Sequence, residues 1–219
     1  MTRVEVSLLN IHETTNIDLK PFATSGEMII LSPSWNPYNS AFDEYLILEY
    51  YTDLGLNEFD TNHQYMKSAR KNYPTATHDY GIRLWHVDAR LLYSNARGEL
   101  DASRITTNAR IASGHVTLMM SNTYYDGDEY SEQYCSPLGT SYANYNLLQL
   151  IRNNTSANYK PTDFFASSSL FKAGDVFTMS KYGKQFVKNG KLNTNTDLGF
   201  SFEVNACNST YASISITKL

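Results

Sequence analysis

A histidine and an acid interrupt an otherwise apolar stretch, "YGIRLWHVDARLLY", at residues 80–93. We predict one long strand there, and alternate residues of a strand point to the same side, so Ile82, Leu84, His86 and Asp88 share one face. A buried imidazole needs hydrogen-bond partners, and Asp88 can supply one. A histidine beside a carboxylate is also an arrangement used for general acid–base catalysis.

A second predicted strand, at 42–52, carries two acids that can join this pair. Either Glu44 or Glu49 can accept a hydrogen bond from His86 if the two strands are neighbours. We therefore expect a structural polar cluster of Glu44, Glu49, His86 and Asp88 that fixes the strand register. A ligand-binding or catalytic His86 is the alternative interpretation.

Two stretches invite comparison with metal sites. "HETTN" at 12–16 begins like the zinc-protease motif H-E-x-x-H, but it ends in Asn16 and lies between predicted strands, so it does not predict zinc binding. The loop "DGDEYSE" offers oxygen ligands of the kind that calcium prefers. Those candidate ligands are Asp126, Asp128, Glu129 and Glu132. A solvated acidic turn is the alternative for this loop.

Nucleophilic and phosphate-binding motifs are missing from the sequence. There is no G-x-S-x-G elbow and no glycine-rich phosphate loop, and neither Cys135 nor Cys207 lies in a recognisable protease motif. The two cysteines either form one bridge or remain two thiols, and their spacing excludes neither state.

The composition is that of a folded globular protein. Of 219 residues, 42% are hydrophobic and 18% are charged, and the net charge is -4. This balance favours no nucleic-acid partner. No apolar stretch is long enough to span a membrane. The first ten residues lack the apolar core of a signal peptide, so we expect either a cytosolic protein or a piece of a longer one.

Alternation of apolar and polar residues dominates the chain and predicts strands. The predicted strands lie at 3–9, 15–22, 26–32, 42–52, 80–93, 115–122 and 175–180, with a hairpin formed by 200–204 and 212–216. Only 141–154 has helical spacing, so we expect one short amphipathic helix there. These elements predict a mainly β fold, an antiparallel β-sandwich of residues 1–219 with a soft boundary near 95–110.

Long polar loops connect these elements at 32–41, 61–79 and 122–141. Loops of this length usually carry function or face a partner. Four aromatic residues on them can stack on sugar rings. These candidate stacking residues are Trp35, Tyr38, Tyr124 and Tyr125.

The strands at 42–52 and 80–93 also carry a family resemblance. "EYLILE" at 44–49 and "GIRLWHVD" at 81–88 resemble two strands that follow the catalytic domain of immune-inhibitor-A-type zinc metallopeptidases, which are secreted bacterial enzymes. The segments 18–31 and 170–204 are similar to other parts of that region. The zinc-binding helix of the family is absent from all 219 residues, so no catalytic residue can be carried over.

The resemblance implies a non-catalytic accessory domain that is extracellular or attached to the cell surface. Its partner would be the metallopeptidase catalytic domain of the same polypeptide, which would precede residue 1 and hold the zinc. This chain would then need no cofactor, apart from the calcium suggested by its acidic loop. A free-standing module that binds carbohydrate or a cell-surface ligand is the alternative, and an enzyme with His86 as acid–base is a third hypothesis.

Overall fold

The alternating apolar residues at the C-terminal end build the first main sheet. A computed structural model describes residues 13–34, 41–64, 66–68, 71–72, 75–94, 100–106, 117–119, 148–154 and 165–219. β12 (Phe200–Cys207) and β13 (Ala212–Lys218) form the predicted antiparallel hairpin. β1 (Thr14–Leu19) pairs with β13, and β11 (Val176–Phe177) pairs with β12, giving the strand order β1-β13-β12-β11.

The most apolar stretches build the second main sheet. β3 (Glu44–Tyr51) and β6 (Gly81–Asp88) lie at its centre and pair antiparallel along all eight residues, from Glu44 opposite Asp88 to Tyr51 opposite Gly81. β2 (Met28–Leu31) and β10 (Leu148–Ile151) form its two edges, giving the order β10-β6-β3-β2. Strands with neighbours on both sides and apolar residues on both faces are typical of sheet centres.

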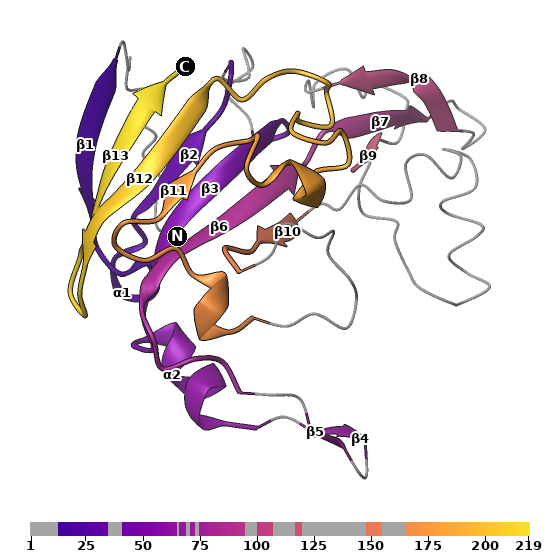
Figure 1. Cartoon of the computed structure of the whole chain (residues 1–219). Helices are drawn as coiled ribbons and strands as arrows, with labels where there is room; N and C mark the ends of the chain where they lie inside the picture. The colour runs from indigo at the N-terminus through magenta and orange to yellow at the C-terminus, as the bar shows by residue number, and fades with distance from the viewer. Residues whose placement is uncertain are drawn as a thin grey trace.

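The hydrophobic core lies between these two antiparallel sheets, which Figure 1 shows as two layers. Leu46, Leu48 and Leu84 enter it from the second sheet, while Val204 and Ile214 enter it from the first. Phe171 adds an aromatic centre, with Phe177, Tyr182 and Phe202 packed around it. The predicted mainly β fold is confirmed, and the two facing sheets are consistent with a β-sandwich.

The stretch at 80–93 is divided between two sheets, so the prediction of one long strand is wrong. β6 ends at Asp88, and β7 (Leu91–Ser94) begins after a break at Ala89 and Arg90. β7 pairs with β8 (Leu100–Thr106) and β9 (Thr117–Met119) in a separate three-stranded sheet. The sequence hides this break because Leu91 and Leu92 continue the apolar pattern.

The helix predicted at 141–154 is also wrong where the structure describes it. Residues 148–151 form β10, which pairs antiparallel with β6 and places Gln149 opposite His86. Short apolar runs fit helix and strand alike, and here pairing with the neighbouring strand decides between them. The helices of the described chain lie elsewhere, at α1 (Phe22–Ser25) and α2 (Leu56–Asn62), with short 3₁₀ turns at 167–169 and 183–185.

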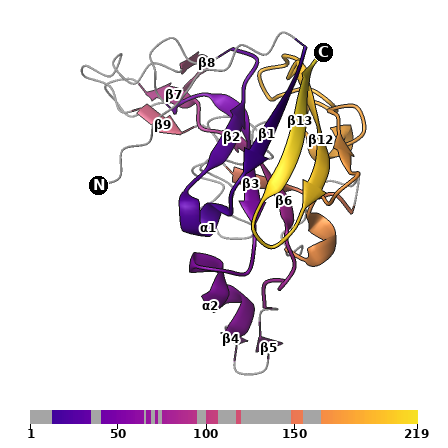
Figure 2. The same cartoon turned by 90° about the vertical axis from the view of Figure 1, so that its left-hand side faces the viewer.

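Small elements extend the sandwich at its two ends. α2 and the hairpin of β4 (Met66–Ser68) and β5 (Lys71–Asn72) project from one end, and the β8-β7-β9 sheet lies at the other (Figure 2). The soft boundary predicted near 95–110 includes β8 of this small sheet, and it stays a prediction. In the part of the chain that the structure describes, no helix has the length and apolar character needed to cross a membrane.

Candidate functional site: a buried polar cluster

His86 and Glu44 meet on the inward face of the second main sheet. Leu46 lies opposite His86 in the β3–β6 register, and Glu44, two residues from Leu46, points to the same side. His86 Nε2 and Glu44 Oε1 are 2.8 Å apart, and both residues are 2% exposed. The imidazole ring also packs against the Phe186 ring, with 5.1 Å between their centroids.

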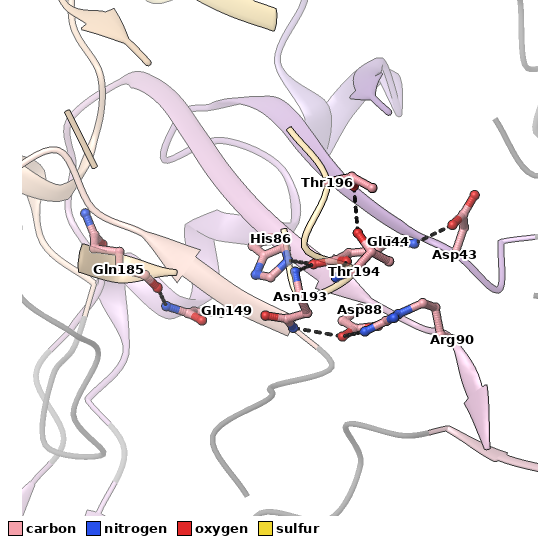
Figure 3. A network of polar contacts seen from close by, with 10 residues as sticks. All are labelled: Asp43, Glu44, His86, Asp88, Arg90, Gln149, Gln185, Asn193, Thr194 and Thr196. Carbon is pink, nitrogen blue, oxygen red and sulfur yellow. Dashed lines mark hydrogen bonds and ion pairs between the residues drawn. The ribbon is translucent and has the colours of Figure 1, made fainter. Parts of the chain in front are cut away.

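The Glu44 carboxylate binds more than the histidine. The backbone N–H groups of Asn193 and Thr194 donate to its two oxygens, the first in a very close contact and the second at 2.8 Å. Glu44 therefore joins β3 to a segment about 150 positions further along the chain, as Figure 3 shows. A carboxylate that accepts three hydrogen bonds in a buried site is a structural tie between the elements that donate them.

Asp88 forms a second tie beside the first. Arg90 donates from Nε and Nη2 to the two Asp88 oxygens at 2.8 and 2.9 Å, and the Asn193 side-chain amide donates to Oδ2 at 2.8 Å. Asp88 is fully buried and Arg90 is 7% exposed. The paired guanidinium offsets the cost of burying this carboxylate at the point where β6 ends.

Gln185 extends the cluster toward β10. Its amide side chain accepts from the backbone N–H of Arg152 and donates to the carbonyl of the same residue, both at 2.8 Å. Gln149 donates in turn to the backbone carbonyl of Gln185 at 2.7 Å. This amide pair fastens the 3₁₀ turn at 183–185 to the edge strand of the sheet (Figure 3).

Asp43 stands at the rim of the cluster, just before β3. Burial raises the pKa of its carboxyl, although the N–H of Glu44 and the charge of Arg90 act in the opposite direction. Asp43 Oδ1 accepts from the Glu44 N–H at 2.8 Å. A half-buried acid of this kind makes folding less favourable when it is ionised.

Glu49 belongs to a different group on the opposite face of the same sheet. It accepts from Trp85 Nε1 at 2.8 Å and forms a close ion pair with Arg83. The Arg83 guanidinium lies over the rings of Tyr51, Trp85 and Phe165, 4.9 to 5.4 Å from their centroids. Of the four residues proposed as one cluster, Glu44, His86 and Asp88 therefore lie in an inner group, and Glu49 pairs with Arg83 on the outer face.

The sequence did not point to most of the inner group. Arg90, Gln149, Gln185, Asn193 and Thr194 belong to no recognised motif, and only the fold brings the last four close to Glu44, His86 and Asp88. The alternation that places His86 and Asp88 on one face was the usable signal. No comparable signal links residues about a hundred positions apart.

The remaining predicted site residues lie outside the described residues. These are the calcium candidates Asp126, Asp128, Glu129 and Glu132, the stacking candidates Trp35, Tyr38, Tyr124 and Tyr125, and Cys135. Cys207 is partly buried on β12 and packs against the core. Among the residues that the structure does describe, no group of three or more His, Cys, Asp or Glu side chains is placed to hold a metal ion.

Comparison of this chain with protein-family models, with curated proteins and with solved structures finds no match. The resemblance to immune-inhibitor-A-type metallopeptidases stays a prediction from the residue patterns at 44–49, 81–88, 18–31 and 170–204. In the structure, 44–49 and 81–88 lie on the paired central strands β3 and β6.

Proposed function

We propose that this chain is a non-catalytic accessory domain of an extracellular or surface-attached zinc metallopeptidase. It packs against the catalytic domain of the same polypeptide and shapes or stabilises the substrate site. The observation that carries this proposal is the Glu44–His86 pair, whose two side chains are buried and hydrogen-bonded to each other. Glu44 is also occupied by two backbone N–H groups.

The roles of the neighbouring residues support a scaffold rather than a reaction centre. In the Trp-His-Val-Asp stretch, Trp85 binds Glu49 and His86 binds Glu44, while Val87 packs with Tyr45. A general acid or base must reach the proton that it transfers in a bound substrate. A histidine sealed between two sheets with its Nε2 on a carboxylate is suited to fixing register instead.

The coding sequence before the Met1 codon gives the first test. An open frame that continues into a segment with H-E-x-x-H supports the proposal, whereas an unrelated upstream sequence favours a free-standing module.

The second test adds the purified chain to a purified catalytic domain of an immune-inhibitor-A-type metallopeptidase. We expect association in sedimentation velocity and slower thermal inactivation of the peptidase. The comparison variant is Glu44→Ala, in which the tie from β3 to Asn193 and Thr194 is lost and both effects should be smaller. Peptidase activity of the chain alone that is lost in a folded His86→Gln variant would show that the proposal is wrong.

A further inference from the structure

A row of large apolar side chains crosses the outer face of the second main sheet. In the strand register Ile30 lies opposite Ile47, Ile47 opposite Trp85, and Trp85 opposite Leu150. We call these four residues the outer row. Successive side chains of a strand point to opposite faces, and Leu48, which follows Ile47, belongs to the core. The outer row therefore faces away from the core and extends across β2, β3, β6 and β10 (Figure 1).

The first main sheet has the opposite kind of outer face. The residues that alternate with its core residues are polar or charged, as expected for a sheet with one face in water. Examples are Asn16, Glu203, Asn205, Ser213 and Ser215. The second sheet departs from this pattern on its central strands and on its edge strands alike. Apolar surface in water costs about 25 cal/mol for each Å², and a partner that covers the outer row would remove that cost.

The outer row keeps part of its surface exposed. Its members on β2, β3 and β6 are only partly buried, and they pack against a small cluster that includes Val87. Leu150 on β10 is also partly exposed. Leu148, two positions before it, shares the same face and is 54% exposed. Adjacent exposed apolar residues mark interaction sites on soluble proteins, and tryptophan is among the residues that contribute most to such interfaces.

The charged residues beside the outer row neutralise each other. Glu49 and Arg83 lie opposite each other in the next row of the same face, two residues along each strand. They form an ion pair, and Glu49 also accepts a hydrogen bond from Trp85 Nε1. This second row therefore brings no net charge to the face, and a second copy of the same face can approach it without electrostatic repulsion.

We propose that two copies of this chain form a dimer through their outer rows, about a two-fold axis that runs parallel to the strands between β3 and β6. Sheets that pack face to face are about 10 Å apart, so the side chains of the two faces interdigitate. This axis places Trp85 of one copy against the partner's Ile47, a large side chain against a smaller one. It also places Leu150 against the partner's Ile30, so the whole row is matched by apolar side chains.

The charged row distinguishes this axis from the alternative. The parallel axis places Arg83 over the partner's Glu49, so opposite charges face each other across the interface. An axis perpendicular to the strands would instead place Arg83 over the partner's Val87, where a guanidinium would lose water without gaining a polar partner. The parallel axis therefore matches apolar with apolar residues and acid with base, as a self-complementary two-fold interface requires.

The size of the outer row sets the strength of dimerisation that we expect. The row is about 14 Å long, since four neighbouring strands lie about 4.8 Å apart. A face of this size is at the low end of specific interfaces, so we expect a dissociation constant in the micromolar range. The inference is independent of the proposed function, because it concerns two copies of this chain with no catalytic domain present.

Sedimentation velocity at protein concentrations from about 1 to about 200 µM tests the proposal, and we expect the sedimentation coefficient to rise from the monomer value toward the dimer value. Leu150→Lys and Ile30→Glu should each weaken dimerisation about tenfold or more, because each places a charge against an apolar side chain of the partner. The matched controls are Asn205→Lys and Asn205→Glu, at an exposed position on the outer face of the first sheet, with a change of less than about twofold.

A mixture of the two charged variants tests the orientation of the dimer. In the proposed pairing, position 150 of the Leu150→Lys variant faces position 30 of the Ile30→Glu variant. An equimolar mixture should therefore recover dimerisation through an ion pair, at concentrations where each variant alone is monomeric. Circular dichroism establishes that the variants are folded. If Leu150→Lys does not fold, Leu150→Ala removes side-chain surface without adding a charge and should weaken dimerisation about fivefold.

Three results would overturn the proposal. The chain could stay monomeric over the whole concentration range, the Asn205 variants could weaken dimerisation as much as Leu150→Lys does, or the mixture of charged variants could stay monomeric. A monomeric chain that binds a peptidase catalytic domain, with binding lost in Leu150→Lys, would assign the outer row to that domain instead of a second copy.

Discussion

Replacement of Glu44 by alanine is the most direct test of the polar cluster. The carboxylate accepts from His86 Nε2 and from the backbone N–H groups of Asn193 and Thr194. Its removal leaves three donors without their acceptor in the interior, at a cost of roughly 1–3 kcal/mol for each unsatisfied group. Such losses are not additive, so we expect a total of about 3–5 kcal/mol for the three hydrogen bonds together.

Urea unfolding followed by tryptophan fluorescence and far-UV circular dichroism measures this change. For a chain of this size, a loss of 3–5 kcal/mol corresponds to a fall in melting temperature of roughly 6–20 °C. Glu44→Gln keeps one oxygen acceptor and should lose about 1–3 kcal/mol. The matched control is Glu203→Ala on β12, where the side chain is exposed, with an expected change within about 0.5 kcal/mol.

We expect a definite order of stability, in which the Glu44→Ala variant lies lowest, Glu44→Gln lies between and Glu203→Ala matches the original chain. A Glu44→Ala variant with a loss below about 1 kcal/mol would refute the structural role assigned to the cluster. Equal losses for Glu44→Ala and Glu203→Ala would do the same, because they would show that burial and hydrogen bonding add nothing to this carboxylate.

Three further predictions concern pH and close packing. Burial disfavours the charged form of Asp79, but hydrogen bonds from Lys172 and Ser167 outweigh this effect and lower its pKa. The stability of the fold should therefore fall as the pH drops below about 4. Asp79→Asn should flatten that part of a curve of melting temperature against pH. Burial raises the pKa of Tyr51 to about 12, so a spectrophotometric titration should show its phenolate forming well above the range of exposed tyrosines, and ionisation near pH 10 would contradict its burial. A methyl group at Gly81 would lie 2.7 Å from the Phe171 carbonyl oxygen, so Gly81→Ala should cost about 1–3 kcal/mol in urea unfolding. A cost below about 0.5 kcal/mol would argue against this close approach.

The fold class and the central strands were predictable because they depend on local apolar patterns. The apolar residues of β12 and β13 alternate with polar ones and β3 is a nearly continuous apolar run, and the structure pairs β12 with β13 and β3 with β6 as antiparallel neighbours. Alternation likewise places His86 and Asp88 on the same inward side. The helix expected at 141–154 failed at β10, since four residues with ambiguous spacing take the conformation that pairs with β6.

The composition of the site depended on contacts that sequence patterns do not encode. Glu44 and Glu49 are five residues apart on one strand, so their side chains lie on opposite faces, and only Glu44 reaches His86. Which carboxylate meets the histidine depends on the β3–β6 register, because a shift by one residue would exchange the two faces.

Local residue patterns were enough to predict a mainly β protein with ionisable residues placed inside an apolar strand. The partners of those residues follow only from the folded chain. Folding brings residues 185–194 over the end of the second sheet, where Asn193 and Thr194 occupy the Glu44 carboxylate. Buried carboxylates must find hydrogen-bond donors wherever the fold supplies them, and here the donors come from a segment that no local pattern connects to β3.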